Sequence, residues 1–167
     1  MTTVGMHSAI ARIIEDEGGI ADVGDGKGVT RFGQTPAWLD ANGLVPPSNA
    51  ADAAANYEVW MTRFQFDQVC ALDPFTGWML ADFAVHSGEQ TAIKVFQRAL
   101  GLADDGVLGP KTLGRFQLIA GSPVLARKFV AQRMRFIGQL LGSEKIDRRK
   151  WAHGWLNRLA DHVEKLP

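Results

Sequence analysis

The sequence predicts a mainly α-helical chain with one small β element. Apolar residues recur at spacings of three and four along most of the chain, which is the periodicity of amphipathic helices. The glycine-rich segment 20–34 interrupts this periodicity with turn-forming residues. The chain has 167 residues, 46% of them apolar and 22% charged, which suffices for a buried core without disulfides or a structural metal.

The first elements follow from the order of apolar and turn-forming residues. The first helix is predicted over about residues 7–17, with an apolar stripe on Ile10, Ile13 and Ile14. Gly18 and Gly19 end it, as glycines commonly do at helix C-termini. Segment 20–34 contains four glycines and two aspartates, which predicts a turn-rich loop or a short β-hairpin.

Helical periodicity returns after residue 34. Thr35 suits an N-cap and Pro36 a first helical position, so a short helix is expected from Pro36 to near Gly43. Further helical segments are predicted over about residues 49–63, 64–72, 74–87, 89–100, 110–120, 123–141 and 151–165.

The formal net charge of zero conceals an asymmetry along the chain. Residues 1–90 carry four basic and twelve acidic side chains, a charge of −8, whereas residues 91–167 carry fourteen and six, a charge of +8. The predicted division is a lobe at 1–90 and a lobe at 91–167, packed as one compact unit. The basic lobe predicts an anionic partner, and the alternative is that the two lobes neutralise each other.

The chain shows no export or membrane signal. Its first residues lack both a basic segment and a long apolar segment, and no run approaches the roughly 18 apolar residues of a membrane helix. We therefore expect a protein made in the cytoplasm and not inserted stably into a membrane.

The segment from Glu17 to Thr30 gathers two carboxylates and a hydroxyl. Glu17 lies at the C-terminal end of a helix among apolar neighbours, and both influences are expected to raise its pKa, which suits a general acid. Asp25 lies on a glycine-rich loop that can fold back toward Glu17, and Thr30 can hold a water. Two carboxylates and a positioned water are the components of glycoside hydrolysis. Taken singly, each residue also fits a surface, turn or backbone role.

The run EGG…DGKGVTRFGQT resembles the N-terminal signature of the phage-type N-acetylmuramidases of glycoside hydrolase family 108. The resemblance implies a lysozyme-like helical fold, with Glu17 as the general acid and Asp25 and Thr30 as the other catalytic residues. It also implies that substrate is bound by residues of the same run, namely Gly28, Gly33 and Gln34. The sequence departs from the family signature at Lys27, where glycine is expected, and at Gln34, where isoleucine is usual.

Two further motifs extend this resemblance. Residues 83–101 are similar to the family's D-x-x-V-N-S-G…L-Q-R-A-L-G segment, and His86, expected to bind substrate, replaces the common asparagine. Residues 105–112, DGVLGPKT, resemble a turn of peptidoglycan-binding helical domains, which serves either as a turn and helix cap or as a glycan contact. In this turn Gly109 is expected to supply the permissive backbone and Pro110 to start a helix.

Aromatic rings are candidates for stacking on sugar faces. Tyr57 and Trp60 resemble a Tyr/Trp pair of the family and are expected to bind substrate. Trp38 and Trp155 are further candidates, whereas Trp78 is better interpreted as core, because it shares a helix with other large apolar residues.

Several other chemistries fit the sequence poorly. The four histidines form no H-x-x-x-H pair, which argues against a zinc amidase. Cys70 has apolar neighbours and is better interpreted as a small buried side chain than as a nucleophile. The basic cluster at 145–150 lacks a nucleic-acid motif, so a solvated helix face is the preferred interpretation. No metal ligands and no cofactor are expected.

The resemblance, together with these observations, implies a phage or prophage endolysin. The expected reaction is hydrolysis of the β-1,4 bond between N-acetylmuramic acid and N-acetylglucosamine in peptidoglycan. The alternatives are a lytic transglycosylase on the same bond and a non-catalytic cell-wall-binding module. We expect a monomer that binds glycan strands but no nucleic acid and reaches the periplasm or cell wall through a holin. Stem-peptide carboxylates are candidate partners of the basic lobe, so salt should weaken wall binding.

Overall fold

The computed structural model describes residues 4–22, 28–142 and 149–166. Across these residues it contains nine α-helices and one two-stranded antiparallel sheet, which confirms the predicted mainly α fold class. The chain divides into two units, Met1–His86 and Ser87–Pro167, and each is described by itself below. The functional roles expected of residues 1–90 and 91–167 stay predictions. None of the described helices combines the length and the apolar character needed to cross a membrane.

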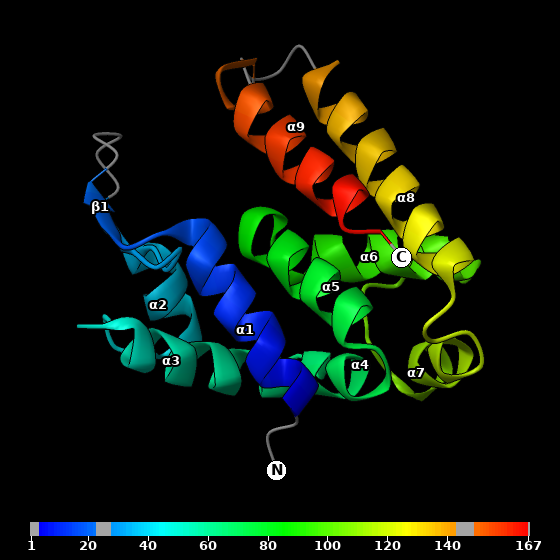
Figure 1. Cartoon of the computed structure of the whole chain (residues 1–167), viewed down its shortest axis with the longest axis horizontal. Coiled ribbons are helices and arrows are strands. Elements are labelled where there is room, and N and C mark those ends of the chain that lie inside the picture. Colours follow the sequence, from blue (N-terminus) through cyan, green and yellow to red (C-terminus); the bar gives the residue numbers. More distant parts are fainter. Residues whose placement is uncertain (1–3, 23–27, 143–148, 167) are drawn as a thin grey trace. The chain divides into compact units, whose positions relative to one another are not determined.

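The first unit is built around its N-terminal helix. Helix α1 (Val4–Glu17) contacts α3 (Ala50–Arg63) and α4 (Phe66–Leu72), as Figure 1 shows. The short α2 (Pro36–Asn42) begins as predicted, because the Thr35 side chain accepts a hydrogen bond from the Trp38 backbone N–H at 3.2 Å. It ends as predicted at Gly43, whose φ of 63° is left-handed.

Helix α5 (Pro74–Ser87) is the most buried element of the first unit. Nine of its fourteen residues are buried, and they form the unbroken run from Thr76 to Ala84, so the middle of the helix is covered on all sides, which is typical of a helix inside a core. Trp78 is 1% exposed, and its interpretation as a core residue is confirmed. The core also contains Tyr57, Trp60, Phe66 and Phe83, all fully or almost fully buried.

The glycine-rich segment contains the small sheet. Strands β1 (Ile20–Asp22) and β2 (Val29–Arg31) pair antiparallel, with Ala21 opposite Thr30. A tight turn after β2 bonds the Arg31 and Gln34 backbones to each other at 2.9 and 3.1 Å. The predicted hairpin strands are therefore present, at the C-terminal end of α1.

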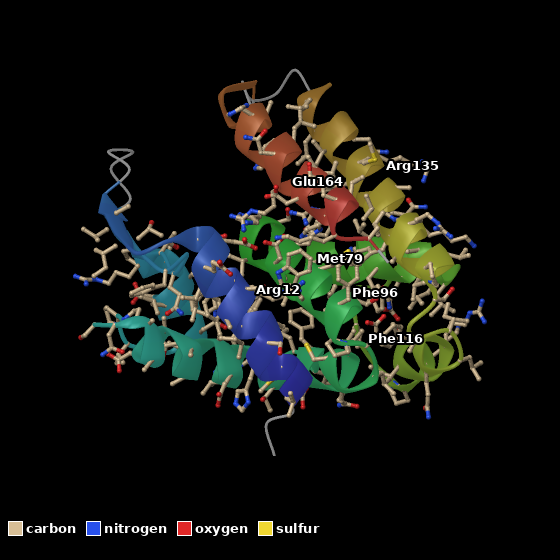
Figure 2. The ribbon with its side chains drawn as sticks, in the orientation of Figure 1. Arg12, Met79, Phe96, Phe116, Arg135 and Glu164 are labelled. Carbon is tan, nitrogen blue, oxygen red and sulfur yellow. The ribbon has the colours of Figure 1, made fainter. Side chains whose placement is uncertain are left out.

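The second unit contains α6 (Glu89–Leu100), α7 (Pro110–Gln117), α8 (Pro123–Leu141) and α9 (Arg149–Glu164). Helices α8 and α9 contact each other and run side by side in opposite directions (Figure 1). Phe96 lies at the centre, with its ring centroid 5.4 Å from that of Phe116 and 5.3 Å from that of Phe129. Figure 2 labels Phe96 and Phe116. The predicted helices over 89–100 and 123–141 match the observed bounds of α6 and α8.

The turn over residues 105–112 serves the fold. The Gln97 side-chain amide donates to Asp105 Oδ1 at 2.7 Å and accepts from the Gly106 backbone N–H at 2.9 Å. Pro110 starts α7, as predicted. The prediction that Gly109 supplies the permissive backbone is wrong, because Gly109 is extended, with φ −92° and ψ −176°. Gly106 has that role, since its φ is 79°.

Candidate active site

Glu17 is the last residue of α1 and faces the turn that follows the sheet. Gly18, with φ 72°, ends the helix directly after it. Only 13% of the Glu17 side chain is exposed, so most of the carboxyl group is shielded from solvent. The location at a helix C-terminus and the partial burial agree with the sequence-based expectation, and the catalytic role of Glu17 stays a prediction.

His86, near the end of α5, is the partner that the fold brings to Glu17. Its Nε2 lies 3.0 Å from Glu17 Oε1, although the two residues are far apart in sequence. A quarter of the His86 side chain, 25%, remains exposed. The predicted site residue His86 therefore lies beside the predicted general acid, where it can hydrogen-bond to it.

Asp82 completes a carboxylate–imidazole–carboxylate cluster. It lies one helical turn before His86 on α5, its side chain is fully buried, and its Oδ1 is 3.7 Å from His86 Nε2. Glu17 is therefore the closer partner of His86 Nε2, whereas Asp82 makes the larger contribution to raising the pKa of His86. Sequence reasoning missed Asp82, although the aspartate of the D-x-x-V-N-S-G pattern falls on it, and its i, i+4 spacing to His86 on one helix face is a second signal.

The two carboxylates control the charge of His86. Burial by itself disfavours the imidazolium, but the interactions with Asp82 and Glu17 outweigh it and raise the pKa of His86 to about 9. His86 is therefore protonated at neutral pH. Its positive charge favours the ionised form of Glu17 and so opposes the two influences that are expected from the sequence to raise the pKa of Glu17.

Gly33 allows the turn to approach Glu17. A Cβ at Gly33 would lie 2.6 Å from Glu17 Cγ and 2.8 Å from the Tyr57 hydroxyl, and the φ of Gly33 is 79°. Both the close approach and the left-handed backbone require glycine. Among the residues predicted to bind substrate, the structure brings Gly33 and His86 to Glu17, and the Tyr57 hydroxyl lies at the same turn.

The prediction that Tyr57, Trp60 and Gln34 bind substrate is wrong, because all three side chains are buried. Tyr57 and Trp60 are both 0% exposed, and their rings pack edge to face at 5.9 Å, so neither presents a face to a sugar. Gln34 is also 0% exposed, since its amide donates to the Ala53 carbonyl and accepts from Asn56, at 2.9 and 2.8 Å.

These buried residues instead support the turn beside Glu17. The Tyr57 hydroxyl donates to the Phe32 carbonyl at 2.8 Å. Phe32 has φ 51°, which is strained for a bulky residue, and this hydrogen bond helps to hold it. Gln34 anchors the other end of the turn to α3. Tyr57 and Gln34 therefore position the turn rather than present a surface to substrate.

The structure describes Thr30 and Gly28 but not Asp25. Asp25 lies outside the described residues, as does Lys27. Thr30 lies in β2 and is half-buried, and Gly28 is exposed with φ 89° just before that strand. Their roles in catalysis and in substrate binding stay predictions.

The cluster could also hold a cation. Glu17, Asp82 and His86 each offer one ligand atom, and these three atoms lie within 4.8 Å of one another. Carboxylate and imidazole ligands of this kind suit a divalent cation such as Zn²⁺. The expectation that the protein needs no metal therefore stays a prediction that requires a direct test.

Cys70 does not join the site. It is 0% exposed, and burial raises its pKa to about 12, with Asp67 and Asp73 adding to the effect. A thiol with this pKa is not ionised at neutral pH, so it is unsuited to nucleophilic attack. The interpretation of Cys70 as a buried small side chain is confirmed.

Comparisons with known proteins connect the second unit to cell walls. A family model described as "Predicted Peptidoglycan domain" matches residues 91–160. Among solved structures, the chain is similar to that of Brucella abortus SagA, with a TM-score of 0.70 and 24% sequence identity. This similarity covers 96% of the present chain and 92% of the other, and at this identity it shows the fold. No curated protein matches the chain. Peptidoglycan is therefore the target indicated for residues 91–160, within a fold that extends over almost the whole chain.

Proposed function

We propose that the protein is a peptidoglycan muramidase that hydrolyses the β-1,4 bond between N-acetylmuramic acid and N-acetylglucosamine, with Glu17 as the general acid. The observation that carries this proposal is the contact of 3.0 Å between His86 Nε2 and a largely shielded Glu17 carboxyl. The peptidoglycan match over residues 91–160 supports the substrate class. The resemblance to phage-type muramidases of glycoside hydrolase family 108 supports the bond and the reaction.

In this mechanism the glycosidic oxygen takes a proton from Glu17 as its bond to the anomeric carbon breaks. Water supplies the hydroxyl group that completes hydrolysis, and the proton that this water releases restores the proton that the Glu17–His86 pair gave to the leaving oxygen. Thr30 and Asp25 are proposed to orient the water or to stabilise the positive charge that develops. Whether the configuration inverts or is retained depends on the separation of the two carboxylates.

His86 supplies the proton that Glu17 needs. At neutral pH the imidazolium N–H lies 3.0 Å from Glu17 Oε1, and its proton passes to Glu17 before Glu17 donates to the leaving oxygen. The buried Asp82 stabilises the positive charge of His86 between cycles. The activity should then fall as the pH rises through about 9, when His86 loses its proton.

In biological terms, we propose an enzyme of phage origin that is released through a holin and acts on the host wall. A monomer suffices for this activity, because the whole cluster around Glu17 belongs to one chain.

The test is product analysis on purified peptidoglycan with Glu17→Gln. Loss of an acid catalyst costs roughly 10²–10⁴ in rate, so the variant should release almost no reducing muramic ends. Glu15→Gln is the matched control, because Glu15 is an exposed carboxylate on the same helix. Undiminished hydrolysis by Glu17→Gln overturns the assignment of the acid. Products with 1,6-anhydro ends identify a lytic transglycosylase, and wall binding without soluble products identifies a binding module.

A further inference from the structure

The second unit contains a groove lined by basic side chains, with a volume of about 980 Å³. Its walls come from the C-terminal end of α6, from α7 and the turn after it, and from one face of α8. Five exposed cations line it: Arg98, Arg115, Arg127, Lys128 and Arg135. We call this feature the basic groove.

Helix α8 supplies most of this charge from a single face. Arg127 and Arg135 are eight residues apart, and Lys128 lies beside them, so all three project from the same side of the helix. Figure 2 shows Arg135 on the side of α8 away from α9. The opposite side of α8 is anchored in the core through Phe129, which packs against Phe96. The cationic face is therefore held by a fixed helix.

Little in the second unit neutralises these cations. No Asp or Glu lines the basic groove, and within the described ranges Arg127, Lys128 and Arg135 have no carboxylate partner. Arg98 is paired with Asp104, with Nε 2.6 Å from the carboxylate, and Arg115 donates to the Leu100 carbonyl at 3.4 Å. The groove therefore has an excess of positive charge that favours an anionic ligand.

The rest of the lining indicates what kind of anion fits. Apolar side chains lie between the cations, including Leu100, Ile119 and Val124, and among the residues that the structure describes none of the lining side chains is aromatic. Single-stranded nucleic acid is usually bound on aromatic stacking platforms, which this groove lacks. Guanidinium groups beside small apolar surfaces suit a peptide that combines carboxylates with alanine side chains.

We propose that the basic groove binds the carboxylates of peptidoglycan stem peptides. Every lining residue lies between 98 and 135, inside the segment 91–160 that matches the peptidoglycan domain model. Stem peptides are short, rich in alanine and carry free carboxylates, which are the groups that the lining suits. The inference goes beyond the proposed cleavage at Glu17, because it assigns recognition of the peptide, rather than the glycan, to a separate site.

The test measures binding of the full-length protein to purified peptidoglycan and to a soluble muropeptide. The groove variant is the triple substitution Arg127→Gln, Lys128→Gln and Arg135→Gln. The matched control removes the same charge from the same unit outside both the groove and the turn at 105–112, with the substitutions Lys94→Gln, Arg158→Gln and Lys165→Gln. Circular dichroism checks that each variant is folded, and the single variants Arg127→Gln and Arg135→Gln replace the triple variant if it is not.

We expect the groove variant to bind about tenfold more weakly than the control variant, because each of three exposed ion pairs contributes about two- to fivefold. Amidation of the peptidoglycan carboxylates should cause a similar loss for the wild-type chain. Added NaCl should weaken wild-type binding more steeply than binding by the groove variant.

Equal binding by the groove and control variants overturns the inference, and so does undiminished binding to amidated peptidoglycan. Tighter binding of an oligonucleotide than of the muropeptide also overturns it and makes the groove a nucleic-acid site. The outcome is separable from the proposed function. If Glu17→Gln still hydrolyses peptidoglycan while the groove variant loses binding, the chemistry proposed for Glu17 fails and the basic groove stands.

Discussion

Replacement of His86 by asparagine tests whether the cluster of Glu17, Asp82 and His86 is charged as we infer. The pKa of His86 is raised from its ordinary value of 6.5 to about 9 by the two carboxylates. A group whose folded-state pKa is raised stabilises the fold fully below its unfolded-state pKa, and that stabilisation is lost as the pH rises through the folded-state pKa. The relevant window is therefore pH 6.5 to 9.

The size of the effect follows from the same two values. One pKa unit corresponds to about 1.36 kcal/mol, so the change from 6.5 to about 9 corresponds to about 3 kcal/mol at most. Between pH 6 and pH 9.5, the free energy of unfolding should fall more for the wild-type chain than for His86→Asn. The difference between the two falls should reach about 3 kcal/mol at most. His7→Asn is the control, because His7 also lies near a carboxylate, 3.2 Å from Glu58, but its side chain is 59% exposed. An exposed pair of this kind contributes only about 0–1 kcal/mol.

The assay is urea unfolding at both pH values, followed by the fluorescence of the tryptophans, of which Trp38, Trp60 and Trp78 lie in the first unit. NMR titration of the histidine rings gives the pKa directly, and the signal that titrates near 9 should be missing in His86→Asn. The activity profile should change too, because the alkaline fall near pH 9 should move to lower pH without His86. If wild type and His86→Asn lose the same free energy of unfolding, and no histidine titrates above about 7, the reasoning about this cluster is refuted.

Three further predictions concern Gly33, Cys70 and the metal question. Gly33→Ala should lower the free energy of unfolding by roughly 2–4 kcal/mol, since it places an alanine in left-handed backbone and its Cβ overlaps with Glu17. Gly43→Ala should lower the free energy of unfolding by only about 1 kcal/mol, because Gly43 has φ 63° but open space around it. Thermal unfolding of the two variants checks this, and equal losses would show that the contact with Glu17 is unimportant. The Cys70 thiol should resist a thiol reagent such as DTNB in the native protein and react fully in urea, because it is buried and its pKa is raised to about 12. Rapid labelling under native conditions would contradict its burial. EDTA should leave the hydrolysis rate unchanged, and a loss that Zn²⁺ or another divalent cation restores would instead assign Glu17, Asp82 and His86 as metal ligands.

The sequence by itself determined the helices and most of their ends. The Thr35 cap, the Pro36 start and the Gly43 end of α2 were predictable because capping depends on a few adjacent residues. The same holds for α6 and α8, whose apolar periodicity is strong. The sequence also placed Glu17, the candidate general acid, at the end of a helix. The choice between Gly106 and Gly109 was a local error, since a Gly-rich turn does not reveal which glycine takes the positive φ.

Only the tertiary structure decided what surrounds Glu17. His86 and Glu17 meet because α5 and α1 pack in one unit, and no local pattern encodes a contact between residues so far apart in sequence. The burial of Tyr57, Trp60 and Gln34 depends on which faces of α3 and of the turn are covered, so residue types that suit sugar binding became core and anchor residues. The sequence could show that the second part of the chain is basic. The packing of α6, α7 and α8 decided that five of its cations line one groove, because only folding places side chains from separate helices side by side.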